Sequence, residues 1–453
     1  MALYPMSPVD AAWLHMDGPA NLAEVTGLLT TREPLDFGAV RAIYAQRLAD
    51  LDRFHQRVVH QGVALSTPYW QDMAHFDIDQ HLHHIALAAP YDAEALRVLV
   101  ADLASTPLNR DLPLWQVHVI DDVDNGSALV MRYHHCIGDG TAMMEVARRL
   151  FTPQNAGQAK ARPRRKRLGA SAATSETPAQ QNVNPAALAV GGAGMLLSEL
   201  IKWPDPGSPF KGEFGLRKQV AWSSPVAIED VKAVGARHEA KVNDVLVAAV
   251  AGALRSYLRQ RGVDVDQTTL RAMVPVDLRA PAQRGQLGNA FGLVILDLPV
   301  NTAQQSQRMA LTKERMDALK HSAEPLAMEF LFNIFGRGPK ALEDVASAIF
   351  GSKTSLVLTN VAGPREPLLL ARAPIERMMF WVPHPGRQLG LGISIMSYNG
   401  VATLTVIADA HLVPDPQTIT QLFNREFGLM LHSVRTEQAR TALRGLHTHQ
   451  HTQ

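Results

Sequence analysis

The chain has little cysteine, little charge and no long apolar run, and each shortage excludes a class of protein. Its single cysteine, Cys136, excludes an internal disulfide and a cysteine-cluster metal site. No stretch reaches the roughly 20 apolar residues that span a bilayer. The first ten residues lack the basic and apolar regions of a secretory signal. Only 19% of the residues are charged, which fits large buried cores. We therefore expect a cytoplasmic protein or one held peripherally on a membrane.

The length of 453 residues predicts more than one folding unit. Hydrophobic cores stop growing near ~250–300 residues, and longer chains then divide. Residues 153–190 contain few large apolar side chains and many small, polar and basic ones, which is typical of a linker. We expect an N-terminal half over 1–152, a mobile basic linker over 153–190 and a C-terminal half over 191–453.

Charge is distributed unevenly along the chain, although its formal net value is only +1. Six basic residues lie between Lys160 and Arg167, and without them the rest of the chain has a net charge of −5. A nucleic-acid-binding fold would spread basic residues over its folded elements, so we expect no nucleic-acid partner. The basic run is either a solvated part of the linker or a contact for anionic headgroups and phosphates.

Apolar residues recur with helical spacing in some segments and with strand spacing in others. Helices are predicted over 40–51, 96–103, 141–151, 245–254, 304–320, 342–350 and 416–431. Strands are predicted over 115–120, 128–135, 219–222, 270–276, 293–300, 355–358, 391–396 and 402–407. Strands interleaved with helices indicate an α/β fold. The apolar segment 326–335 is either a core or tunnel-lining helix, or a helix that contacts lipid.

The segment from Tyr133 to Gly140 is the most informative part of the sequence. It follows a predicted strand, whose alternation places His135 on one face and His134 on the other. One histidine can therefore face a channel while the other braces the turn. Gly138 and Gly140 are expected to permit a sharp turn into the next helix, which returns Asp139 towards the histidine backbone.

Histidine titrates near ~6.5 and can accept a proton from an alcohol, amine or thiol at neutral pH. Asp139 either orients an imidazole or holds the turn through an ion pair. Cys136 is turned away from His135 by strand alternation, and no Gly-x-Ser-x-Gly elbow, P-loop or dinucleotide fingerprint occurs. These observations favour direct transfer to a deprotonated acceptor over a covalent enzyme intermediate.

The arrangement His-His-x-x-x-Asp-Gly resembles the signature of the chloramphenicol acetyltransferase-like superfamily, which includes condensation domains. The chain resembles more closely the bacterial wax ester synthase/diacylglycerol acyltransferase family. The matching segments are Met6–Leu14, Pro107–Trp115, Val242–Leu246, Val274–Arg279, Leu287–Asn289 and Thr359–Pro364. The chain departs from the family pattern at Asn21–Glu24, at His55 and at Cys136–Gly138, which affects substrate choice more than chemistry.

This resemblance implies two chloramphenicol acetyltransferase-like halves with a shared active-site tunnel and His135 at its middle. It implies an acyl-CoA-dependent O-acyltransferase that needs no cofactor or metal. His135 would take the hydroxyl proton of a long-chain alcohol or diacylglycerol, and the products would be wax esters or triacylglycerol. Contact with the inner membrane or lipid inclusions is then expected. Asp139 would be mainly structural, with Arg279 or Arg57 as its ion-pair partner.

Four further residues have two interpretations each. Asn243 either caps a helix or presents its amide to the substrate or the developing oxyanion. Asn289 either hydrogen-bonds within a loop or contacts the active site. Pro113 and Trp115 either shape the strand beside the histidine motif or bind ligand. His81, His83 and His84 lie on a predicted strand that scatters them between faces, so no metal site is expected.

Two rival functions remain open at this point. One is another acyltransferase of the superfamily, which would acylate a hydroxyl or an amine in polyketide or peptide-lipid assembly from a carrier-protein thioester. The other is a lipid-binding protein without catalysis, which would have no need for His135.

Overall fold

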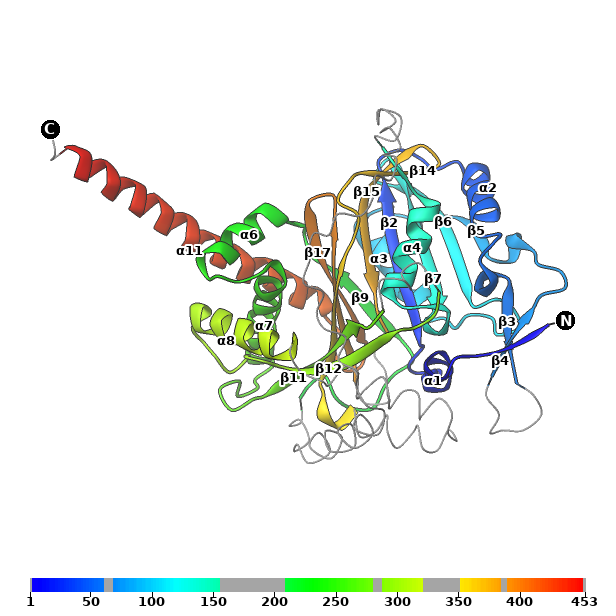
Figure 1. Cartoon of the computed structure of the whole chain (residues 1–453), viewed down its shortest axis with the longest axis horizontal. Helices are drawn as coiled ribbons and strands as arrows, with labels where there is room; N and C mark the ends of the chain where they lie inside the picture. The colour runs from blue at the N-terminus through cyan, green and yellow to red at the C-terminus, as the bar shows by residue number, and fades with distance from the viewer. Residues whose placement is uncertain are drawn as a thin grey trace, which may run out of the picture.

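A computed structural model of the protein describes residues 2–60, 68–154, 208–279, 287–320, 351–383 and 389–450. Of residues 320 and 437–450 it describes the backbone alone. The basic run 160–167, the apolar segment 326–335, the predicted helix 342–350 and most of the predicted linker lie outside the described residues. Two seven-stranded sheets stand side by side and carry helices on their outer faces (Figure 1).

The first sheet is built mainly from the N-terminal part of the chain. Its strands, in spatial order, are β5 (Leu82–Ala86), β6 (Trp115–Val123), β7 (Gly126–His134), β2 (Glu24–Thr31), β15 (Ala373–Trp381), β14 (Leu368–Leu370) and β8 (Thr152–Pro153). Its helices are α1 (Pro8–Met16), α2 (Phe37–Arg47), α3 (Ala93–Ala104) and α4 (Gly140–Leu150). A separate small sheet joins β1 (Leu3–Pro5), β4 (Tyr69–Asp72) and β3 (Gln56–Val59).

The second sheet comes from the C-terminal part. Its strands, in spatial order, are β10 (Val226–Ala227), β17 (Val401–Asp409), β16 (Leu391–Tyr398), β13 (Leu356–Ala362), β11 (Leu270–Asp277) and β12 (Phe291–Leu298), and β9 (Lys218–Trp222) also pairs with β17. Helices α6 (Ile228–Arg237), α7 (Val242–Gln260), α8 (Gln305–Lys320) and α11 (Pro416–Gln450) lie on this side of the molecule (Figure 1). Sheets interleaved with helices confirm the predicted α/β class.

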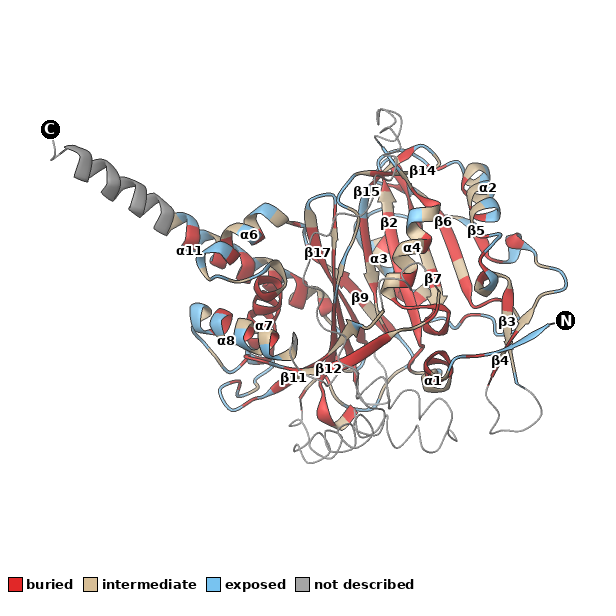
Figure 2. Cartoon of the chain, in the orientation of Figure 1, coloured by how far each residue is buried: buried red, intermediate tan, exposed pale blue. Residues whose placement is uncertain are grey.

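Helix α7 is the central helix that the apolar run 245–254 predicts. Fourteen of its 19 residues are buried, and Figure 2 shows it among the most deeply buried helices. A helix that is apolar on nearly every side is stable only when neighbours cover all of it. Helices α6, α8 and α11 supply that cover.

Strand β15 is one of several elements, with α1 and β2, that the sequence analysis did not predict. It lies late in the chain, yet it pairs antiparallel with β2 of the first sheet, for example Phe380 with Gly27. Trp381 at its end packs into a core with Val220 and Ile407 from the second sheet. The sheets are therefore interlocked by an exchanged segment, and the division at 153–190 does not coincide with sheet membership.

A buried ion pair stabilises the first sheet next to the histidine motif. Arg132 on β7 donates to Glu24 on β2 at 2.7 Å, and both side chains are at most 4% exposed. Glu24 also accepts from the backbone N–H of Leu108 at 2.8 Å.

Among the described helices, none has the length and apolar character needed to cross a bilayer.

Candidate active site

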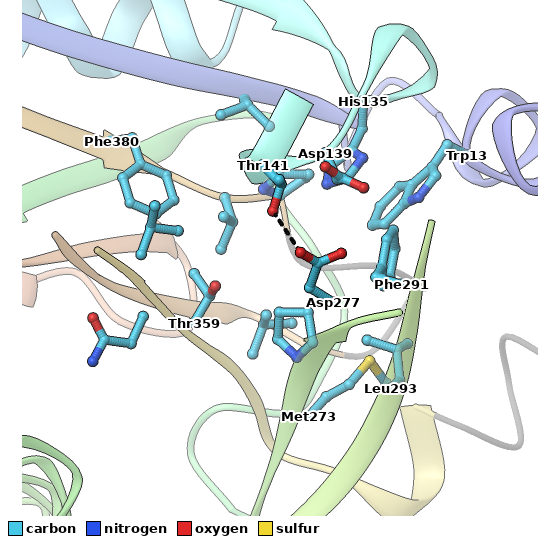
Figure 3. A pocket seen from close by; sticks show the side chains of 18 of the residues that line it. Trp13, His135, Asp139, Thr141, Met273, Asp277, Phe291, Leu293, Thr359 and Phe380 are labelled. Atoms are coloured by element: carbon cyan, nitrogen blue, oxygen red, sulfur yellow. Dashed lines mark hydrogen bonds between the residues drawn. The ribbon is translucent and has the colours of Figure 1, made fainter. Parts of the chain in front are cut away.

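A cavity of about 160 Å³ lies between the two sheets, and the histidine motif lines it. Figure 3 shows His135, Asp139 and Thr141 on one side of it, facing strands β11 and β12 on the other. Its apolar wall consists of Trp13, Val25, Met273, Phe291, Leu293, Val357, Val361, Phe380 and Val382, among others. The cavity is thus mostly apolar, with polar groups on both sides: His135, Asp139 and Thr141 on one, and Asp277, Thr359 and Asn360 on the other.

His135 lies at the end of β7, where the strand passes into a short 3-10 turn, His135–Ile137. Its backbone N–H donates to the carbonyl of Ala23 at 2.8 Å, and its ring stacks on Trp13 with centroids 3.9 Å apart. Burial lowers the pKa of His135 to about 4, partly opposed by the charge of Asp139. The imidazole is therefore neutral at pH 7 and able to accept a proton.

The hydrogen bonds of His135 distinguish its two ring nitrogens. Nδ1 lies 3.0 Å from Oδ1 of Asn289. The amide nitrogen of Asn289 donates to the carbonyl of His135 at 2.8 Å and to Asp10 at 2.8 Å. Since the Asn289 oxygen can only accept, Nδ1 carries the hydrogen and Nε2 is the nitrogen with a free lone pair.

His134 has the bracing role that strand alternation predicts for one of the two histidines. Its Nδ1 accepts from the backbone N–H of Cys136 at 3.1 Å, and its Nε2 is 3.9 Å from Asp17. Burial lowers the pKa of His134 well below its usual value. Burial also raises the pKa of the Cys136 thiol, and its side chain is fully buried, so this cysteine is a poor nucleophile.

Asp139 is paired with Arg279, one of the two partners that the sequence suggests. Both of its oxygens accept from Arg279 at 2.6 Å. Asp139 also caps α4 by accepting from the N–H of Ala142 at 3.0 Å, and it accepts from the N–H of Ala290 at 3.0 Å. The other candidate, Arg57, donates instead to Gln71. Asp139 therefore fastens the turn to the loop before β12.

The glycines act differently from the prediction. Gly138 has a φ of 171°, which is extended backbone, so the turn does not depend on its conformational freedom. A Cβ at Gly138 would lie 2.9 Å from the Cβ of Ala142, and close packing is what excludes a larger residue. Gly140 begins α4 and lines the cavity. The residue that does need a positive φ is Gly288, at +100°.

Gly288 belongs to the facing loop and joins the two sheets at the site. Its N–H donates to the carbonyl of Ile137 at 3.0 Å, and its carbonyl accepts from the N–H of Asp139 at 3.3 Å. Arg279 donates to the same carbonyl at 2.5 Å. The turn that carries His135 is therefore held by backbone contacts from both parts of the chain.

Asn243 does not cap α7, which corrects one of its two interpretations. The helix begins one residue earlier, and Asp244 accepts from the N–H of Lys241 at 2.8 Å. The Asn243 oxygen accepts from the side chain of Asn360 at 2.7 Å. This amide pair lines a second cavity of about 70 Å³, which shares Asn360 and Pro275 with the first.

Trp115 and Pro113 do not line the described cavity. Trp115 is buried, donates its indole N–H to the carbonyl of Phe54 at 2.9 Å and stacks on His81. Pro113 is buried beside it, and its carbonyl accepts from the N–H of Trp115 at 2.8 Å. Their positions are those of core residues in the wall of the first sheet, and the ligand-binding interpretation is not supported there.

The neighbouring histidines have separate polar contacts. His81 forms a hydrogen bond with the carbonyl of Trp115, His83 forms one with the side chain of Gln116, and His84 forms one with the carboxylate of Asp121. Within the described ranges, no three side chains of His, Cys, Asp or Glu are grouped so as to hold a metal ion.

Sequence reasoning missed several residues of the site. Asp10 and Trp13, both on α1, contact Asn289 and His135. Asp277 accepts from Thr141 at 3.2 Å across the cavity (Figure 3). The signal for Asp10 and Trp13 was available, because both lie in the N-terminal segment that resembles the family.

Comparison with known proteins places the chain in a family. The wax ester synthase/diacylglycerol acyltransferase catalytic domain matches residues 6–246, and the C-terminal domain of the same family matches residues 287–431. A protein of Mycobacterium tuberculosis named as a probable diacylglycerol O-acyltransferase, tgs1, is 29% identical over 82% of this chain and 83% of its own length.

Solved structures share the fold. The wax ester synthase/diacylglycerol acyltransferase from Marinobacter aquaeolei is 20% identical, with a TM-score of 0.70 over 95% of this chain and 99% of that one. The starter condensation domain of rhizomide synthetase, solved with C8-CoA, is 14% identical with a TM-score of 0.58 over 96% and 94% of the chains. With one domain model matching more than half of the sequence and a second following it in order, the chain belongs to the wax ester synthase/diacylglycerol acyltransferase family and is an acyltransferase.

Proposed function

We propose that the protein transfers a fatty acyl group from acyl-CoA to the hydroxyl group of a long-chain alcohol or diacylglycerol. One observation carries this proposal. A neutral histidine with a free Nε2 lines an apolar cavity between the sheets. An alkyl chain matches such walls, and a hydroxyl group needs a base of this kind.

In the proposed reaction, Nε2 of His135 takes the proton of the acceptor hydroxyl group. The hydroxyl oxygen attacks the thioester carbonyl and forms a tetrahedral intermediate with a negative oxygen. The intermediate collapses, the carbon–sulfur bond breaks, and the CoA thiolate takes the proton from the imidazolium. The ester and free CoA are the products, and His135 is again neutral. The fully buried thiol of Cys136 takes no part.

The second cavity supports a long substrate. Apart from Asn243, Asn360 and Pro275, it is lined by apolar side chains of α7, α8 and strands β11, β12, β13 and β16, including Val247, Leu296 and Met316. We assign this space to the distal part of an alkyl chain. Asn243, paired with Asn360, which lines both cavities, would contact the substrate there.

CoA is the donor that we propose. The rhizomide starter domain, which shares this fold, was solved with C8-CoA and Leu-SNAC, and a CoA thioester donor is consistent with that structure. An acceptor other than a lipid alcohol is the alternative that the experiment must separate.

The test supplies palmitoyl-CoA with either hexadecanol or dioleoylglycerol and measures both CoA release and neutral lipid. We expect ester formation with at least one acceptor and its near loss in His135→Ala. His84→Ala is the matched control, because His84 lies away from the cavity and pairs with Asp121. Inactivity of the natural protein towards every lipid alcohol would reject this function, and full activity of His135→Ala would reject the base.

A further inference from the structure

A buried carboxylate behind the catalytic turn has no part in the reaction as written. Asp10 lies on α1 and is only 1% exposed. Its Oδ1 accepts twice from Asn289, from the backbone N–H at 3.1 Å and from the amide nitrogen at 2.8 Å. Burying a carboxyl group costs free energy unless specific contacts compensate for the lost hydration. The position of Asp10 directly behind Asn289 therefore indicates a role in the site.

The surroundings of Asp10 hold the carboxyl group in one place. Arg53 is 3.8 Å from Oδ2 and lies over the ring of Trp70 at 4.1 Å. The N–H of Asp10 donates to the side chain of Ser7 at 3.1 Å at the start of α1. Gly288 passes close by, and a Cβ there would meet both carboxylate oxygens at 3.7 to 3.9 Å. Asp10 is thus a fixed acceptor aimed at Asn289.

A fixed acceptor at this point selects one of the two orientations of the Asn289 amide. In the observed orientation the amide nitrogen lies between two acceptors, the carboxylate of Asp10 and the carbonyl of His135. The flipped amide would place an oxygen against both acceptors and lose both hydrogen bonds. The carboxyl oxygen of Asp10 accepts in either protonation state, so the selection does not depend on its charge.

The orientation of the amide in turn selects the tautomer of His135. With Oδ1 of Asn289 3.0 Å from Nδ1, the ring must carry its hydrogen on Nδ1. A flipped amide would donate to Nδ1, and the hydrogen would then occupy Nε2. That tautomer has no lone pair on Nε2 to take a proton from the acceptor.

We propose that Asp10 is a positioning residue that acts through Asn289 to hold His135 in the Nδ1–H tautomer, so that Nε2 is free to act as the base. This inference rests on the proposed function only for the identity of the substrate. The chain of contacts joins α1, the loop before β12 and the end of β7, which are far apart in the sequence.

The test reads the tautomer directly, without turnover. Protein labelled with ¹⁵N at histidine gives separate Nδ1 and Nε2 signals, and the signals of His135 are those lost in His135→Gln. We expect a single Nδ1–H form in the natural protein. In Asp10→Ala, which removes the acceptor, we expect a mixed or Nε2–H form, with kcat lowered about 10- to 100-fold. The KM for acyl-CoA should change little, because Asp10 does not line the cavity.

A conservative variant separates positioning from simple destabilisation. Asp10→Asn keeps a side-chain oxygen that can accept from Asn289, so we expect it to retain the Nδ1–H form and most of kcat. Asp92→Asn is the control, since Asp92 is an exposed helix cap far from the site. It should change neither measurement.

The outcomes decide the proposal in every case. If Asp10→Ala keeps the pure Nδ1–H form and its kcat, Asp10 has no positioning role. If that variant does not fold, Asn289→Ala gives the test, because it removes the amide and leaves Asp10 in place. A pure Nδ1–H form in Asn289→Ala would overturn the proposal. Failure of the natural protein to acylate lipid alcohols leaves the tautomer result unaffected, so the two proposals are tested separately.

Discussion

The two sides of the cavity are built by different kinds of interaction. On the side of His135, hydrogen bonds and an ion pair fix each polar group, as in the pairing of Asp139 with Arg279. On the opposite side, strands β11 and β12 present apolar side chains such as Met273 and Leu293. Directional contacts set the geometry of a base, whereas apolar walls accept chains without strict geometry. Chemistry and chain selection can therefore vary separately.

The largest effect is expected from the polar side. Among the described histidines, His135 alone lines the cavity. His135→Ala removes this base, and we expect a loss of about 10²- to 10⁴-fold in kcat/KM. Release of CoA in the presence of hexadecanol or dioleoylglycerol measures it. The variant should keep the melting temperature of the natural protein to within a few degrees, so that the loss belongs to chemistry.

Breaking the ion pair should affect stability as well as activity. Arg279→Ala leaves Asp139 as a buried unpaired carboxylate, and we expect a loss of about 3–5 kcal/mol in the free energy of unfolding. Urea denaturation measures this change. Arg57→Ala is the matched control, because among the described residues Arg57 donates to Gln71 alone, and it should cost about 1 kcal/mol or less. Equal losses in the two variants would contradict the assigned role of Arg279.

Substitutions on the apolar side should change the selectivity for chain length and leave the base intact. Met316 lines the second cavity from α8, so Met316→Trp should fill it and shorten the chain that fits. We expect kcat/KM for palmitoyl-CoA or for hexadecanol to fall about tenfold relative to its eight-carbon counterpart. Met316→Leu preserves volume and should retain the preference. An unchanged chain-length profile in Met316→Trp would show that the substrate does not reach this space.

The smallest effect concerns pH. Burial lowers the pKa of His135 to about 4, and a base works only in its deprotonated form. Activity should therefore be lost only as pH falls towards 4, and kcat/KM should be level from about pH 5.5 to 7.5. Asp139→Asn removes a charge that raises this pKa, so the acid limb should move to lower pH. An acid limb near the ~6.5 of a free histidine would contradict a buried base.

Local patterns predicted much of this protein. The hairpin of β6 and β7, the buried helix α7 and the separation of His134 from His135 follow from spacing along single segments. The family resemblance was carried by short motifs in a fixed order. Periodicity and motifs depend on neighbours in the chain, so one sequence is enough to detect them.

Contacts between distant segments were not accessible in the same way. Strand β15 joins the first sheet although it lies in the C-terminal part, and no periodicity states which sheet a strand enters. Asn243 is the second residue of α7, two positions after the cap, and Gly138 is needed for packing rather than for its conformation. Each of these features depends on residues that are distant in the sequence and close in the folded structure.

The sequence by itself predicted a histidine base at position 135 and no local nucleophile beside it. Only the tertiary structure decided which ring nitrogen keeps a free lone pair, because Asn289 contacts His135 and is held by Asp10, and these residues lie 154 and 125 positions away along the chain. It also chose Arg279 over Arg57 as the partner of Asp139. The physical reason is that hydrogen bonds depend on the distance and direction between atoms, which only the folded chain defines.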